Sequence, residues 1–204
     1  MVETNKTNLL LGYMGESIFH EYLYETNTDN VRIIIWTDPV DHPDPIYDVL
    51  EEIKALMPPG HLTIRNSRVD TFSPDDFQFE KGLQYLMVFD KCFSGRKSTR
   101  EPEQNIVQFI NTFAPPGNVT LCVLERSYSN LPYSISRKQF DYVCVEGELL
   151  RSKITRLYNV RNAGTLSAAL DVCSNDTYIK LEKSGKWALA KRSKHKFETL
   201  FHHN

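Results

Sequence analysis

Leu86-Met87-Val88-Phe89-Asp90, an apolar run that ends in a carboxylate, decides the fold of this chain. Residues 119–124 form a second apolar run. Runs of this kind without polar alternation are typical of strands covered on both faces, as in a parallel sheet. Between the two runs lie a basic loop at 94–100 and a segment from about 103 to 113 whose apolar residues recur with helical spacing. The order strand, loop, helix, strand predicts an α/β fold.

The first 25 residues predict a strand, a glycine-containing turn and a helix. Residues 8–11 form the expected strand, and Gly12 and Gly15 lie in the turn that follows it. In a phosphate-binding loop, glycines expose backbone N–H groups, a lysine neutralises phosphate and a hydroxyl holds magnesium. Gly15 and Ser17 fall where the last glycine and the hydroxyl would be, but Glu16 holds the lysine position. A carboxylate repels a polyphosphate, so we do not expect ordinary ATP binding, and the turn can equally be a plain strand-to-helix connection.

The rest of the chain first continues to alternate between predicted strands and helices, and its last third is then predicted to consist mainly of antiparallel strands. We expect further elements as follows: strand 31–36 ending at Asp38, helix 45–57, strand 62–64, strand 140–145, strand 152–160 as its antiparallel neighbour, and a hairpin of 177–181 with 187–191. Residues 165–172 fit a helix or a strand. The predicted organisation is a flexible end at 1–7, one domain over 8–191 and a basic tail over 192–204.

Composition limits the possible functions. The 204 residues carry a net charge of −2, so any contact with nucleic acid must be local. No window resembles a signal peptide or a membrane span, which predicts an intracellular protein without a membrane partner. The cysteines lack the spacing of a metal or redox motif and are expected to be reduced: Cys92, Cys122, Cys144 and Cys173. No metal site is expected.

Two loops combine features that suit contact with single-stranded nucleic acid. The loop at 94–100 is basic, and the loop at 125–138 mixes aromatic and basic side chains, which can stack on bases and neutralise phosphates. The candidate contacts are Arg96, Lys97, Arg100, Arg126, Arg137 and Lys138. Charged loops are also common without such a role.

This order of elements resembles the ATPase core of the RecA family, in particular a small, degenerate paralog of the eukaryotic strand-exchange recombinase that has the ATPase core alone. The resemblance implies a doubly wound, mainly parallel RecA-like core with antiparallel C-terminal strands. Asp90 matches the magnesium-associated acid, Asp38 holds the place of the catalytic glutamate, and the two loops correspond to DNA-binding loops. The degenerate nucleotide site would comprise Gly12, Gly15, Glu16, Ser17, Asp38 and Asp90.

The resemblance also implies a function. We expect a non-catalytic nuclear subunit without a cofactor that forms a heterodimer with a recombinase paralog. It would assist or remodel recombinase filaments on single-stranded DNA in homologous recombination, with DNA contacted through the complex.

A second resemblance is to a degenerate class I methyltransferase fold of the anamorsin N-terminal type, a protein-interaction module without cofactor. The elements between residues 31 and 124 fit it, but residues 8–25 have no role in it, and no G-x-G-x-x-G follows strand 31–36.

Overall fold

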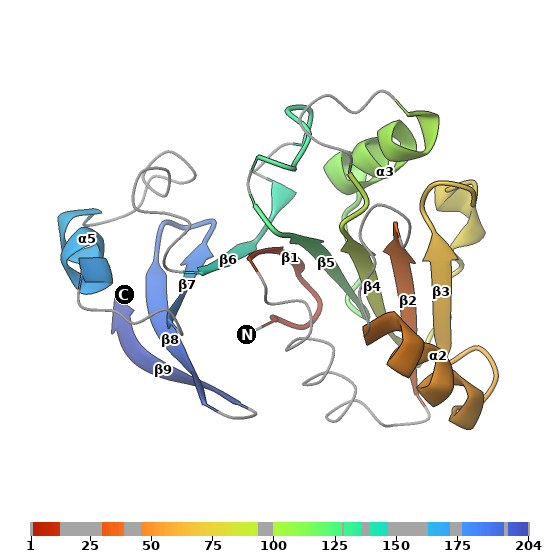
Figure 1. Ribbon diagram of the computed structural model, residues 1–204, viewed down its shortest axis with the longest axis horizontal. Helices are drawn as coiled ribbons and strands as arrows, with labels where there is room; N and C mark the ends of the chain where they lie inside the picture. Colours follow the sequence, from red (N-terminus) through yellow and green to blue (C-terminus); the bar gives the residue numbers. More distant parts are fainter. Residues whose placement is uncertain are drawn as a thin grey trace.

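A single mixed sheet organises the protein (Figure 1). The computed structural model describes residues 2–12, 30–38, 46–93, 100–127, 129–135, 139–146, 163–171, 177–193 and 196–203. Within them the sheet has nine strands in the order β3-β2-β4-β5-β1-β6-β7-β8-β9. The strands are β1 Thr7–Leu11, β2 Val31–Thr37, β3 Leu62–Asn66, β4 Gln84–Asp90, β5 Val119–Glu125, β6 Tyr142–Glu146, β7 Thr177–Glu182, β8 Trp187–Ser193 and β9 Lys196–His203. The helices are α2 Ile46–Leu56, α3 Glu101–Thr112 and α5 Ala163–Asp171, with a short 3₁₀ turn at Pro74–Asp76.

The first strand lies in the middle of the sheet. β1 pairs in parallel with β5 on one side and β6 on the other, so that Leu9 lies opposite both Val123 and Val143. β2, β3 and β4 extend the parallel part, whereas β7, β8 and β9 pair antiparallel beyond β6. The predicted doubly wound, mainly parallel sheet with antiparallel C-terminal strands is therefore confirmed. The methyltransferase-like alternative assigns no strand to residues 8–25. The central position of β1 in the sheet therefore argues against that alternative.

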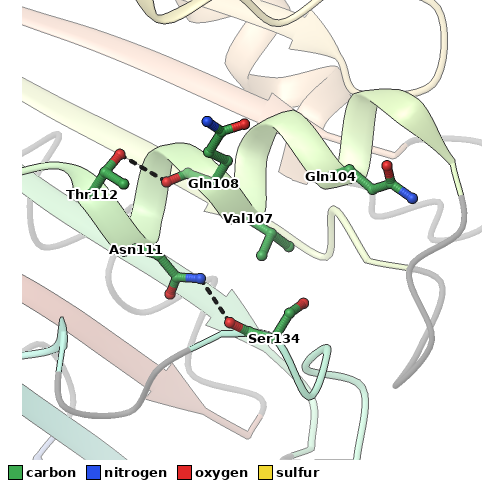
Figure 2. Close-up of a pocket in the computed structure, with 6 residues that line it drawn as sticks. All are labelled: Gln104, Val107, Gln108, Asn111, Thr112 and Ser134. Atoms are coloured by element: carbon green, nitrogen blue, oxygen red, sulfur yellow. Dashed lines mark hydrogen bonds between the residues drawn. The ribbon is translucent and has the colours of Figure 1, made fainter.

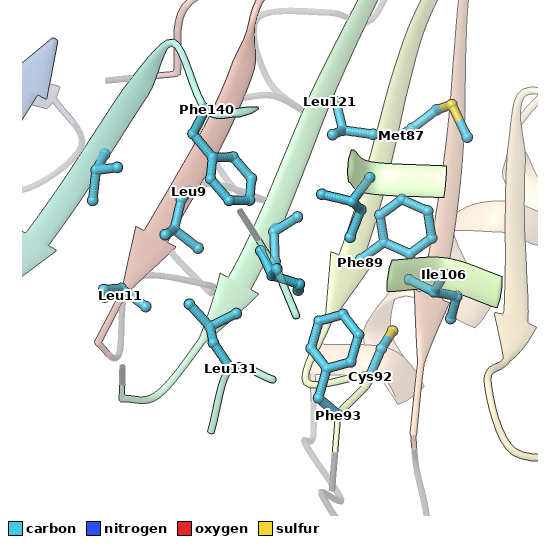
Figure 3. Close-up of a cluster of buried hydrophobic side chains, with 14 of the residues drawn as sticks. Leu9, Leu11, Met87, Phe89, Cys92, Phe93, Ile106, Leu121, Leu131 and Phe140 are labelled. Atoms are coloured by element: carbon cyan, nitrogen blue, oxygen red, sulfur yellow. The ribbon is translucent and has the colours of Figure 1, made fainter. Parts of the chain in front are cut away.

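Helices cover both faces of the sheet. On one face, Tyr47 and Leu50 of α2 pack with Leu10, Ile35 and Val88. On the other face, α3 packs against a larger cluster that includes Leu9, Phe89, Leu121 and Phe140 (Figure 3). Each helix ends where the sequence requires it: Pro58 follows α2, and Pro115 and Pro116 follow α3, and proline cannot continue a helix. Pro102 and two glutamates occupy the first turn of α3, which suits a helix N-terminus.

Aromatic side chains cover the edge of the core on the face of the sheet where α3 packs. Phe72, from the loop after β3, is 2% exposed, and its ring centre lies 5.1 Å from that of Phe109 and 5.2 Å from that of Trp36. Phe77 packs against Phe72, and Phe79 stacks on Phe77; both are partly buried and cover the edge of the core. This cluster joins the loop to β2, β4 and α3.

Both ends of the chain contact the sheet. Near the N-terminus, where flexibility is predicted for residues 1–7, Asn5 N donates to Thr120 Oγ1 at 2.8 Å, Glu3 pairs with Lys180, and Thr7 is buried in β1. The basic tail expected at 192–204 contains the end of β8 and the edge strand β9, because the chain reverses and continues the hairpin register.

The neighbour of β6 was also misplaced. β6 was expected to pair with a strand at 152–160, which lies outside the described residues; its neighbours are β1 and β7. The undecided segment 165–172 lies largely in the helix α5, whereas the predicted hairpin is confirmed as β7 and β8.

Other expectations fall partly within the described chain. Cys92, Cys122 and Cys144 are buried free thiols, as predicted, and Cys173 lies outside the described residues. The helix expected after the glycine turn also lies outside them. No helix in the described part of the chain combines the length and apolar character needed to cross a membrane.

Candidate functional site

Acidic residues gather where the parallel strands end. Asp90 ends β4 and lies opposite Thr37 of β2, Asp38 follows β2 by one residue, and Glu125 ends β5 opposite Leu11 of β1. All three carboxyl-bearing residues are almost completely buried, at 1–2% exposure. The carboxyl ends of parallel strands form the usual ligand-binding edge of an α/β sheet, so this cluster is the candidate site.

Two arginines hold Asp38. Arg68 Nε donates to Asp38 Oδ2 at 2.7 Å, and an Arg100 guanidinium nitrogen lies 3.6 Å from the same oxygen. Arg100 also pairs with Glu103, one helical turn further along the chain in α3. Arg68 comes from the loop after β3 and Arg100 precedes α3, so Asp38 connects three parts of the chain.

Tyr47 of α2 holds Asp90. The Tyr47 hydroxyl donates a short hydrogen bond to Asp90 Oδ2. Burial and the neighbouring Asp90 carboxylate raise the pKa of Tyr47 far above its ordinary value, so the phenol keeps its proton. Burial raises the pKa of the nearby Cys92 thiol as well, with Asp90 and Glu125 adding to it. Cys92 Sγ donates to the Trp36 carbonyl at 3.0 Å and is therefore a packing residue and not a reactive thiolate.

Glu125 differs from both aspartates. Neither of its carboxyl oxygens has a hydrogen-bond partner among the described residues. Burial raises the pKa of Glu125 well above its ordinary value, and Asp90 adds to the shift; Asn130, the Phe93 backbone N–H and Lys91 oppose it without outweighing it. Asn130 and Phe93 approach the carboxyl without meeting hydrogen-bond geometry. Folding therefore favours the protonated form of Glu125 over its ionised form.

The charges of the described cluster balance. Lys91, which follows Asp90 with a left-handed φ of 51°, is 9% exposed and supplies a positive charge near Glu125. Apart from Glu125, whose protonated form burial favours, the three described carboxylates match the three described cations. The carboxylates are Asp38, Asp90 and Glu103, and the cations are Lys91, Arg68 and Arg100. Within the described residues, no three His, Cys, Asp or Glu side chains are placed to hold a metal ion.

The Tyr47 contact can be tested directly. Tyr47→Phe is expected to lower the free energy of unfolding by about 1–3 kcal/mol, because it removes a donor from a buried carboxylate without changing the packing. Urea unfolding at pH 7 measures the loss. Tyr133→Phe, at a 72% exposed tyrosine, is the matched control and should change little. Equal effects of the two variants would contradict the assigned contact.

The sequence-predicted site residues are only partly brought together. Gly12 lies at the end of β1 with a φ of 117°, which favours glycine, and its N–H donates to the Glu125 carbonyl at 2.9 Å. Asp38 and Asp90 lie at the same edge of the sheet, at the ends of β2 and β4. The remaining residues of the predicted nucleotide site, Gly15, Glu16 and Ser17, lie outside the described residues.

The candidate DNA contacts divide in the same way. Arg126 is exposed just after β5, whereas Arg100 is engaged with Asp38 and Glu103. Arg96, Lys97, Arg137 and Lys138 lie outside the described residues. Neither loop is therefore described as a continuous basic surface.

Solved structures place this arrangement among nucleotide-binding folds. The genome packaging NTPase B204 of Sulfolobus turreted icosahedral virus 2, in complex with AMPPCP, is similar over 90% of this chain and 96% of its own, with a TM-score of 0.53 and 11% identity. The chain has an ATPase-like fold. With the sheet order above, the comparison confirms the α/β, RecA-like core, but it does not identify a recombinase paralog.

Two further structures score lower. The same NTPase in complex with AMP has a TM-score of 0.49 at 10% identity and covers 95% of this chain and 96% of its own. EssC (ATPases 2 and 3) from Geobacillus thermodenitrificans has a TM-score of 0.43 at 9% identity, over 69% of this chain and 31% of its own. No protein-family model and no curated protein matches the sequence.

A groove of about 470 Å³ lies beside α3, apart from the acidic cluster (Figure 2). Its lining is uncharged, and Asn111 Nδ2 donates to the Ser134 carbonyl across it at 2.7 Å. The lining residues are Gln104, Val107, Gln108, Asn111, Thr112 and Ser134. The groove therefore adds no charged group to the candidate site.

Sequence reasoning missed Glu125, Tyr47 and Arg68. Glu125 had a signal, since it ends a buried apolar run as Asp90 does, but it was assigned to the following loop. Tyr47 and Arg68 had no local signal, because each meets its aspartate only after a helix or a loop packs against the strand ends.

Proposed function

We propose that this chain is a non-catalytic subunit with an ATPase-like fold that works by pairing with a catalytic partner. One observation carries the proposal: each of the two aspartates expected to serve magnesium and water activation already has a partner inside the protein. Arg68 and Arg100 hold Asp38, and the Tyr47 hydroxyl holds Asp90. Magnesium coordination at Asp90 would compete with a buried hydrogen bond.

Charge supports the same proposal. A bound magnesium–ATP complex brings net negative charge, which a catalytic site offsets with lysine or arginine side chains. Here the described cations Lys91, Arg68 and Arg100 already lie among an equal number of carboxylates. Glu16, in the lysine position of the turn, would add a further negative charge.

The partner we propose is a recombinase paralog, in a heterodimer that assists recombinase filaments on single-stranded DNA during homologous recombination in the nucleus. The sequence resemblance and the RecA-like core support this role. A neighbour named for genome packaging supports only the wider idea that the fold suits work on nucleic acid. Exposed Arg126 is positioned after β5 for contact with DNA in such an assembly.

Nucleotide binding tests the first part of the proposal. Thermal unfolding of the isolated chain should be the same with and without millimolar magnesium–ATP, whereas a ligand at 100 times its Kd adds about 2.7 kcal/mol of stability. Asp90→Asn tests the candidate site, and Asp75→Asn, at an exposed acid, is its control. Stabilisation of the wild type by ATP that Asp90→Asn abolishes and Asp75→Asn preserves would overturn the proposal.

Reconstitution tests the second part. A recombinase paralog that cross-links to this chain would be purified with it, and ATP hydrolysis by the complex would be measured. With Asp90→Asn in this chain, the rate should stay within about twofold of wild type, since the partner does the chemistry. A tenfold loss would show that this chain contributes to the reaction, and a paralog that does not associate would remove the proposed pairing.

A further inference from the structure

Positive charge is concentrated in the last three strands. Residues 177–203 have a formal charge of +5, which leaves −7 for the rest of the chain because the whole carries −2. The charged residues of this segment are Lys180, Lys183, Lys186, Lys191, Arg192, Lys194 and Lys196, against Glu182 and Glu198. A separation of this size within a 204-residue protein produces a strongly polarised surface potential.

The charged segment has a rigid frame. β7, β8 and β9 form the antiparallel end of the sheet, on the opposite side of β1 from the acidic strand ends of β2 and β4 (Figure 1). Ile179, Leu181, Trp187 and Leu189 are 0–4% exposed and fix β7 and β8 to the core. Cationic residues on these strands are therefore held in place by folded structure, which limits the entropy lost when they bind a ligand.

Three lysines of this frame are available for an external anion. Lys183 and Lys191 are exposed, and Lys186 is partly exposed beside Gly185 in the β7–β8 turn. No ion pair within the described part of the chain engages any of the three. Lys180 is different, because it pairs with Glu3 and lies over the Tyr142 ring, 4.7 Å from its centre.

We propose that the β7–β9 end of the sheet is a binding surface for the phosphate backbone of nucleic acid. Phosphates along one strand follow each other at about 3.4 Å intervals. Lysines at both ends of the β7–β8 hairpin, Lys183 and Lys186 in the turn and Lys191 opposite Thr177, can therefore meet different phosphates of one strand. An acidic protein needs such a local surface, since its remaining charge repels a polyanion. The residues of this surface are not those of the loops at 94–100 and 125–138, and its binding needs no partner subunit.

The test uses the full chain and a fluorescent single-stranded oligonucleotide, with affinity measured by anisotropy over a range of salt concentrations. The wild type should bind in the range of 10⁻⁴ to 10⁻⁶ M, as for non-specific electrostatic binding. The triple variant Lys183→Gln, Lys186→Gln, Lys191→Gln should bind at least tenfold more weakly. Its slope of log affinity against log salt should be smaller by about 2, or about 0.7 for each lost contact.

A matched variant separates local contact from net charge. Lys6→Gln, Lys54→Gln, Lys81→Gln removes the same charge from the other part of the protein and should leave affinity and slope nearly unchanged. Both triple variants should unfold at the wild-type Tm, because they alter surface residues. Equal losses in the two variants, or no loss in the first, would overturn the proposal.

A further measurement distinguishes nucleic acid from an anionic membrane as the partner of this surface. Vesicles containing phosphatidylserine are offered to the same proteins, and binding to vesicles but not to oligonucleotide would overturn the assignment to nucleic acid. Failure here is distinguishable from failure of the proposed function, since the ATP and pairing measurements do not involve residues 183–191.

Discussion

Glu125→Gln is expected to stabilise the protein at pH 8 and to reduce the loss of stability that the wild type shows as pH rises above 4.5. The reason is the buried carboxyl at the end of β5, which lacks a hydrogen-bond partner among the described residues and lies beside Asp90. Glutamine keeps the shape of the protonated side chain without an ionisable proton.

The direction follows from proton linkage. The folded-state pKa of Glu125 is raised well above its ordinary value of 4.5, so the folded protein keeps a proton that the unfolded chain releases. Its contribution to stability is complete below pH 4.5 and is lost as pH rises toward the folded-state pKa. Each pH unit in that range should cost about 1 kcal/mol in the wild type.

Urea unfolding at several pH values measures the effect. Glu52→Gln, at an exposed glutamate of α2, is the matched control and should keep the wild-type pH dependence. A wild-type stability that rises between pH 5 and pH 8 in parallel with that of Glu125→Gln would show that Glu125 is already ionised in the folded state.

Phe72→Ala should lower the free energy of unfolding by about 3–5 kcal/mol, the usual cost of truncating a buried phenylalanine. The residue belongs to a loop, where such a loss is unusual. Its ring lies 5.7 Å from Phe89 and 5.1 Å from Phe109, so the truncation leaves a cavity between β4 and α3. Chemical denaturation at pH 7 measures the loss.

Two further variants isolate the cavity. Phe72→Leu keeps most of the apolar volume and should cost clearly less than alanine. Val69→Ala, in the same loop at a residue 76% exposed, should cost little. A small loss for Phe72→Ala, similar to that of Val69→Ala, would mean that the loop does not contribute to the core.

The parallel strands were predictable because burial on both faces leaves an unmistakable apolar run. Residues 86–89 and 119–124 form such runs. The acid that ends the first run, Asp90, is also visible in the sequence. The sequence also predicts that Asp38 and Asp90 lie at the same edge of the sheet, since parallel strands bring their carboxyl ends together.

The unpredicted features depend on long-range contacts or on weak patterns. Arg100 is a predicted DNA contact, but its partner Asp38 becomes a neighbour only when α3 packs on the sheet. The lysines and arginine at 191–196 suggested a basic tail, but β9, which begins at Lys196, pairs with β8 as an edge strand; an edge strand needs pairing on one side only and can carry charged residues. Local pattern also does not determine which strands become neighbours.

The central place of β1 has a consequence for synthesis on the ribosome. β1 is synthesised well before its partners, since among the described strands it pairs only with β5 and β6, through Leu121 to Glu125 and Tyr142 to Val145. Such distant pairing is slow and leaves apolar segments exposed. Leu9, Leu10 and Leu11 must therefore wait for more than half of the polypeptide, and a nascent chain stopped before β5 would be a chaperone substrate and not a folding intermediate with a native centre.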